Sequence, residues 1–195
     1  MSTLEIPQRY QGIQYRTAEV DPKNVDPDEG TLLCRVAPYD HEVPIDHELF
    51  ESFAPKAFER AALAPTRVKM WMGHGGPLIG HARVVEDKPD GVWVRAKFAN
   101  TLAAQEARAL ASDGEDDGGA TLDQVSITFK PMRDWMKVTR KADGVHVRHA
   151  RAGLLGFALV AHGAYAERAM IASVRDGLTD RDKEARIARL MALDH

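Results

Sequence analysis

The sequence predicts an α+β protein built on a mostly antiparallel β-barrel of about seven strands, surrounded by peripheral helices. Three observations lead to this fold class. Runs with the period of strands follow one another through most of the chain, separated by turn residues. Helical patterns are confined to a few segments. Strands and helices do not alternate regularly, which disfavours a parallel α/β sheet.

Length and composition limit the chain to one globular domain and exclude several classes of function. Its 195 residues suffice for one full core, and 44% apolar with 28% charged residues is a globular composition. The net charge of −3 gives no basic surface for nucleic acid. No apolar run reaches the roughly 18 residues of a membrane span, and no signal-peptide core is visible. Cys34 is the single cysteine, so we expect a small buried side chain, no internal disulfide and synthesis in a reducing cytoplasm.

The first half of the chain contains five strand-like runs and one short helical segment. Residues 12–18 and 92–98 alternate between apolar and polar side chains, whereas 31–38 is continuously apolar and therefore more buried. Residues 39–54 are expected to form an irregular excursion, and residues 55–63 a helix with proline in its first turn. The predicted strands are 12–18, 31–38, 67–72, 79–86 and 92–98.

The second half is predicted to add four strands and three helices. Asn100 or Thr101 caps a helix that runs to about Ser112, because this segment is rich in Ala, Leu, Glu and Arg. The acidic, glycine-rich residues 113–120 are expected to form a loop. Of the strands that follow, the middle two are joined into a hairpin by residues 142–144. The strands are 125–130, 135–141, 145–150 and 154–161, and the closing helices are 164–173 and 179–193.

These elements divide the chain into an N-terminal arm (1–12), one domain (13–173) and a C-terminal helix (174–195). The final helix places Ile187, Leu190 and Met191 on one face. This apolar stripe either docks the protein to a partner or packs on its own barrel.

Two side chains are candidates for catalysis. His74 lies in a glycine-rich break between two strands, in VKMWMGHGGPLIGHARV, where glycines let a substrate approach the backbone closely. Ser126 is a hydroxyl within the apolar strand VSITF. A serine needs an adjacent base to act as a nucleophile, and an imidazole is suited to that role. A purely structural serine in a strand is the simpler interpretation of Ser126 when it is considered alone.

The order of several motifs resembles the prohead proteases of tailed phages, a family that shares its fold with the herpesvirus assemblins. The motifs are ESFAPKAFERAAL (51–63), the strand ending in His74, Leu78-Ile79-Gly80, FANTLAAQEARAL (98–110), VSITF (125–129) and GFALVAHGAYAERA (156–169). The resemblance covers roughly residues 12–172. It implies an assemblin-like fold and a serine endopeptidase in which His74 is the general base and Ser126 the nucleophile.

The third catalytic member departs from the family pattern. That pattern begins its last strand with Glu, or with His in the herpesvirus branch, and this chain has Gly156 there. Either a Ser/His dyad acts alone, or another residue fills the space, or activity is lost. If Ala152-Gly153 were a hairpin turn, His149 would lie directly opposite Gly156 and its imidazole would reach that space. His162 is the less favoured alternative.

The resemblance also implies partners and a place of action. Backbone N–H groups near Gly163 and Ala164 would form the oxyanion hole, with Arg168 as the nearest arginine. The substrate would be the scaffolding segment of the major capsid protein, and the protease itself. The work would take place inside the procapsid in the host cytoplasm, with no cofactor, metal, nucleic acid or membrane. The herpesvirus branch implies a homodimer.

Two other classes of function remain open from the sequence. A catalytically silent member of the same fold, retained as an assembly or scaffolding factor, would explain Gly156. A small ligand-binding barrel would instead place Ser126 far from His74.

Overall fold

The computed structural model describes residues 14–18, 30–112, 120–161 and 171–174. Within these ranges lie twelve strands, one α-helix and three short 3-10 helices. The strands are β1 (Gln14–Ala18), β2 (Thr31–Pro38), β3 (Val43–Asp46), β4 (Leu49–Phe53), β5 (Lys69–Met72), β6 (Leu78–Lys88), β7 (Gly91–Phe98), β8 (Gln124–Pro131), β9 (Met136–Lys141), β10 (Gly144–His149), β11 (Ala152–Val160) and β12 (Ile171–Val174). The helices are η2 (Glu59–Leu63), η3 (Pro65–Arg67), α1 (Leu102–Ser112) and η4 (Arg133–Trp135).

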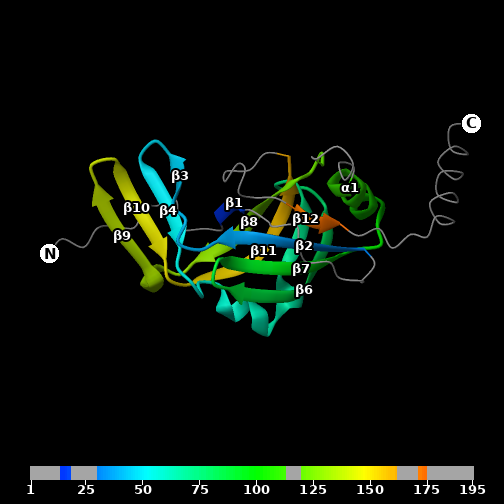
Figure 1. Ribbon diagram of the computed structural model, residues 1–195, viewed down its shortest axis with the longest axis horizontal. Helices are drawn as coiled ribbons and strands as arrows, with labels where there is room; N and C mark the ends of the chain where they lie inside the picture. Colours follow the sequence, from blue (N-terminus) through cyan, green and yellow to red (C-terminus); the bar gives the residue numbers. More distant parts are fainter. Residues whose placement is uncertain (1–13, 19–29, 113–119, 162–170, 175–195) are drawn as a thin grey trace, which may run out of the picture.

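Eight strands form a large sheet in the order β1-β8-β11-β5-β6-β7-β2-β12. All neighbouring pairs are antiparallel except β11 and β5, which run parallel. The sheet curls, so that β1 and β2 lie close together although five strands separate them in the sheet order (Figure 1). The predicted mostly antiparallel, strand-rich architecture is therefore present, as a curled sheet with more strands than the predicted seven or so.

A second, four-stranded sheet has the order β3-β4-β10-β9. It lies at one end of the molecule, and α1 lies at the other end (Figure 1). Its strands β4 and β10 run parallel, and β9 and β10 form the predicted hairpin, with Lys141 paired to Gly144. Leu49 and Val147 are the fully buried members of a small core of its own.

The main core fills the concave side of the large sheet. Alternate residues of β8, namely Val125, Ile127 and Phe129, are all 0% exposed. Phe53 and Phe58 pack against Phe129, with ring centroids 5.0 and 6.4 Å from it. Burying each such ring stabilises the fold by about 1.5–3 kcal/mol. The core therefore fixes the direction in which each residue of β8 points.

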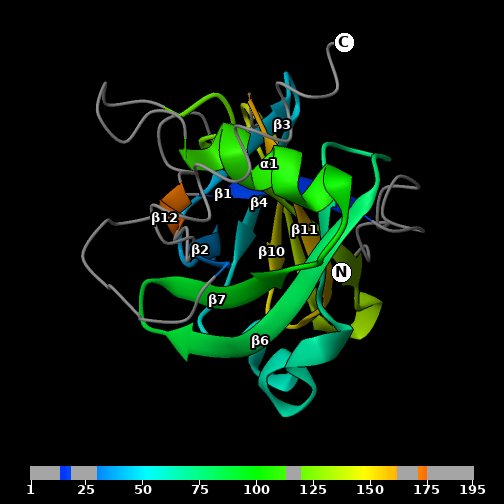
Figure 2. The same cartoon turned by 90° about the vertical axis from the view of Figure 1, so that its right-hand side faces the viewer.

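Helix α1 lies across one end of the curled sheet (Figure 2). It begins where predicted, because the Thr101 Oγ1 accepts a hydrogen bond from the Ala104 N–H at 3.2 Å. Ala104, Ala107 and Ala111 form its buried face. Among the described helices none is long and apolar enough to cross a membrane.

Three predicted elements are wrong. Residues 39–54 contain strands β3 and β4 rather than an irregular excursion, because they pair with each other and β4 also pairs with β10. The segment 55–63 forms turns and the 3-10 helix η2 rather than an α-helix. Ile171–Val174 is a strand on the edge of the large sheet, so the helix expected over 164–173 is wrong at its end, and residues 164–170 lie outside the described residues. The arm 1–12 and the helix 179–193 lie outside the described residues.

In the described part of the chain, four connections cross between the two sheets, and two of them lie side by side. The chain passes from β4 to β5 and again from β10 to β11, and both β4–β10 and β5–β11 are parallel pairs. Between the sheets the segments stay hydrogen-bonded. Ala54 N–H donates to His149 O at 2.9 Å, and Ala152 N–H donates to Ala57 O at 2.9 Å. The connection from β10 to β11 is thus a crossing between sheets.

Candidate active site

His74 lies in the short connection between β5 and β6. Gly73 and Gly75 have φ angles of 70° and 76°, a left-handed conformation that glycine adopts without strain. Two hydrogen bonds close the connection and tie it to the sheet. Met72 N–H donates to Pro77 O at 3.1 Å, and Gly73 N–H donates to Leu159 O of β11 at 2.9 Å. The imidazole is therefore carried on a turn fixed to the end of β11.

Ser126 lies on the face of β8 that points away from the core. Its neighbours Val125 and Ile127 point into the core, and side chains alternate along a strand, so Ser126 and Thr128 share the opposite, outer face. Both are nevertheless buried, at 1% and 4% exposure.

The sheet register brings Ser126 toward His74. Ser126 pairs with Ala158 of β11, and Ala158 pairs with Trp71 of β5. Residues in one row across a sheet point to the same face, and two strand spacings place Ser126 about 10 Å from Trp71 along the row. His74 follows Trp71 by three residues.

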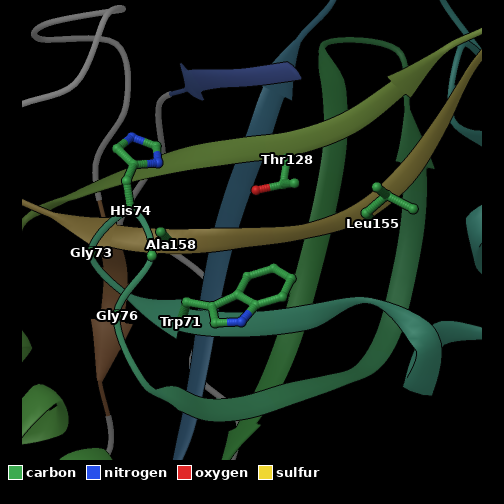
Figure 3. A pocket seen from close by; sticks show the side chains of 8 residues that line it. Trp71, Gly73, His74, Gly76, Thr128, Leu155 and Ala158 are labelled. Carbon is green, nitrogen blue, oxygen red and sulfur yellow. The ribbon is translucent and has the colours of Figure 1, made fainter. Parts of the chain in front are cut away.

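A cavity of about 480 Å³ covers this outer face. Figure 3 shows His74 at one end of it, above the strands, with Thr128 and Leu155 further along β8 and β11. The Trp71 ring closes the opposite side. The lining residues are Trp71, Gly73, His74, Gly75, Gly76, Thr128, Leu155 and Ala158. His74 and the two strand neighbours that flank Ser126, Ala158 across the sheet and Thr128 along it, therefore line one cavity.

The predicted hairpin that would place His149 opposite Gly156 is wrong. Ala152 and Gly153 are not a turn: they pair with Pro131 and Lys130 of β8, and Gly156 pairs with Thr128. His149 and Gly156 therefore do not face each other across a hairpin, because the chain crosses from the small sheet to the large sheet between them.

His149 instead lies in the core, at 0% exposure. Its Nε2 is 2.8 Å from the Oε1 of Glu51, which is also 0% exposed. Its ring contacts Phe53 and Phe129, each at a centroid distance of 5.3 Å. Phe129 is on the inner side of β8, whereas the cavity lies over the outer side. The structure therefore does not bring His149 to the cavity.

Gly156 leaves no space for a side chain. A Cβ at this position would approach the Lys69 carbonyl oxygen and the Trp71 Cζ3 to well under 3.0 Å, a distance that real Cβ atoms essentially never show. The Trp71 ring thus covers the position at which the resemblance expects a third catalytic side chain. Trp71 and Thr128 were not predicted from the sequence, although a polar residue two positions after Ser126 is a signal for a shared face.

The remaining predicted positions add no further group to the cavity. His162, Gly163, Ala164 and Arg168 lie outside the described residues. Within the described ranges, no cluster of three or more His, Cys, Asp or Glu side chains could hold a metal ion.

His146 is held on the small sheet. Its Nδ1 is 2.8 Å from Glu42 and its Nε2 is 3.0 Å from Asp143. Hydrogen bonding to Glu42 and then to Asp143 raises the pKa of His146 above its ordinary value.

Comparison with known proteins gives one family match. No curated protein and no solved structure matches the chain. Among protein families, residues 33–181 match the caudovirus prohead serine proteases. The match spans the two strands that flank the His74 turn, the strand of Ser126 and the strand of Gly156. The chain belongs to the family of caudovirus prohead serine proteases.

Proposed function

We propose that Ser126 is the nucleophile and His74 the general base of this serine protease. One observation carries the proposal: His74 lines the same cavity as Ala158 and Thr128, the residues that flank Ser126 across and along the sheet. The fixed row Ser126–Ala158–Trp71 supports a short path between hydroxyl and imidazole. A ligand-binding barrel with these two groups far apart is disfavoured by this register.

In the proposed reaction these two groups and water take part in every transfer of a proton or an acyl group. The Ser126 Oγ attacks the peptide carbonyl while His74 accepts its proton. The C–N bond then breaks, and His74 returns the proton to the leaving amine. Water, deprotonated by the same imidazole, cleaves the acyl-serine ester and restores the serine. Backbone N–H groups near Gly163 and Ala164 are the proposed stabilisers of the oxyanion.

The proposed catalytic unit is a dyad. The position of the expected third member is occupied by the Trp71 ring, and the alternative imidazole, His149, is bonded to Glu51 in the core. Loss of an orienting third group lowers the rate of such enzymes but leaves residual catalysis from the other groups.

The proposed substrate is the scaffolding segment of the phage capsid protein, together with the protease itself. Cleavage would occur within the procapsid and would involve a homodimer. Membership of the prohead protease family supports a capsid protein as substrate.

Co-expression with the capsid protein tests this proposal. Ser126→Ala and His74→Ala should each abolish cleavage of the capsid protein. Ser52→Ala is the matched control, because Ser52 is also a buried serine, 5% exposed, but lies on the small sheet. A fluorophosphonate probe should label the wild-type protein at Ser126, as mass spectrometry of its peptides would show. Cleavage that persists in Ser126→Ala would refute the assignment.

The alternative is an inactive assembly factor of the same family. The loss of a side chain at Gly156 is the observation that favours it. Procapsids that assemble normally with an uncleaved capsid protein, in wild type and Ser126→Ala alike, would support this alternative.

A further inference from the structure

The cavity beside Ser126 has an apolar character that the two catalytic groups do not explain. Its walls are the Trp71 ring, the Leu155 side chain, the Ala158 methyl group and the glycines of the His74 turn. His74 is the one ionisable side chain among the described residues that line it. Its volume, about 480 Å³, lies within the roughly 300–1,000 Å³ typical of pockets that bind small molecules.

The absence of a side chain at Gly156 allows the Trp71 ring to form one wall of the cavity. A side chain there would displace the Trp71 ring, because even a Cβ atom would overlap Cζ3 of that ring. With glycine, the indole of Trp71 lies beside β11 and lines the cavity (Figure 3). Where the family pattern has a polar Glu or His side chain, this protein therefore has Gly156 and, over it, the aromatic surface of Trp71.

Thr128 adds one polar group to this apolar surface. Its Oγ1 is buried and has no hydrogen-bond partner in the structure that is described, although the residue lines the cavity. A buried hydroxyl without a partner is costly, so such groups are rare unless a ligand satisfies them. Thr128 lies two residues from Ser126, on the same face of β8.

We infer that this cavity takes an apolar side chain of the substrate, next to the cleaved bond, and that the Thr128 hydroxyl bonds the main chain there. The inference rests on the proposed function, since it defines the substrate of that same site. Leu155 lies at a register shift of β11 and is partly exposed, so its side chain can be changed without disturbing the core.

The test profiles cleavage by the full-length protein on a peptide library randomised on both sides of the bond. The wild type should enrich aliphatic or aromatic residues at one adjoining position. Leu155→Glu should lose that enrichment and gain cleavage beside Lys or Arg, because a carboxylate in the wall attracts a cation. Gly153→Ala, on the same strand but outside the cavity, should leave the profile unchanged, since its added methyl meets nothing closer than 3.7 Å.

Thr128→Val separates a substrate contact from a structural role. Valine has the same shape and lacks the hydroxyl, so kcat/KM should fall about 3- to 10-fold. The melting temperature should stay constant or rise, because an unsatisfied buried hydroxyl has been removed. A drop in melting temperature with unchanged kcat/KM would show a structural hydroxyl and overturn its role as a contact.

The outcomes distinguish a failure of the subsite from a failure of the proposed function. If the wild type cleaves and is labelled at Ser126, but shows no apolar preference and no shift in Leu155→Glu, the subsite is refuted and the protease stands. If the wild type neither cleaves nor is labelled, the proposed function fails and the subsite fails with it.

Discussion

A single added methyl group at Gly156 should destabilise the protein far more than the same change three residues earlier. In Gly156→Ala the new Cβ overlaps two groups, the Lys69 carbonyl oxygen and the Trp71 ring. The oxygen belongs to β5, which pairs with β11 in the middle of the large sheet, so it moves only if that pairing is disturbed. In Gly153→Ala the nearest atoms lie at 3.7 Å, an ordinary contact.

The expected magnitudes follow from these contacts. Overpacking a well-packed site costs about 1–3 kcal/mol, and overlap with main chain places Gly156→Ala at the upper end, near 3 kcal/mol. Gly153→Ala should be neutral or stabilise by up to about 1 kcal/mol, because alanine loses less conformational entropy on folding. The two free energies of unfolding should therefore differ by at least about 2 kcal/mol, or roughly 4–8 °C in melting temperature for a chain of this size.

Urea unfolding followed by circular dichroism measures this difference directly. Equal stability of the two variants, within about 0.5 kcal/mol, would refute the close packing of β5 and Trp71 on Gly156. Gly156→Glu, which restores the residue of the family pattern, should likewise unfold more easily and should not raise the cleavage rate.

Two further predictions concern buried and paired histidines. Glu51→Ala should lower the free energy of unfolding by about 1–3 kcal/mol, because it removes the buried hydrogen-bond partner of the His149 Nε2, and urea unfolding measures this. Hydrogen bonding to Glu42 and Asp143 raises the pKa of His146 above its ordinary value of 6.5, so the stability from this network is full below about pH 6.5 and is lost as pH rises through the raised pKa. His146→Gln should therefore flatten the fall in melting temperature between about pH 6 and pH 8.5.

Conservative variants provide the controls. Glu51→Gln retains a hydrogen-bond acceptor for His149 and should cost much less than Glu51→Ala; equal losses would show that the retained acceptor does not stabilise His149 and would contradict this explanation. His47 has a side chain that is 87% exposed, so His47→Gln should leave the pH dependence as it is in the wild type. A pH profile unchanged by His146→Gln would contradict the role of the network.

Elements that depend on local pattern were predicted well. The strand Thr31–Pro38 has the predicted bounds, because its continuous apolar run is buried on both sides. The cap by Thr101 and the turn after Lys141 were also predicted, since each depends on residues within a few positions of one another.

Elements that depend on pairing between distant parts of the chain were not predicted. Strands β3 and β4 are short and carry charges and a proline, and β4 is stabilised by β10, about a hundred residues further along the chain. The position of His149 was predicted wrongly for the same reason. Its predicted position assumed that neighbouring segments pair with each other, whereas the chain leaves one sheet for the other between β10 and β11.

The candidate site depends both on local sequence pattern and on pairing between distant strands. The sequence proposes His74 for its glycines and Ser126 for its place in an apolar strand. The register of three strands then places Ser126 in one row with Trp71, three residues before His74. The aromatic wall could not be predicted, because the effect of Gly156 depends on which ring lies beside it.

The parallel pairing of β5 with β11 has a consequence for the order of events during synthesis. Lys69 pairs with Gly156, so the two strands that border the cavity are made 87 residues apart (156 − 69). Contacts between such distant residues form slowly, and they cannot form at all before the later strand leaves the ribosome. A nascent chain that already carries His74 and Ser126 therefore has no completed cavity. The cavity can therefore be completed only after synthesis has passed β11.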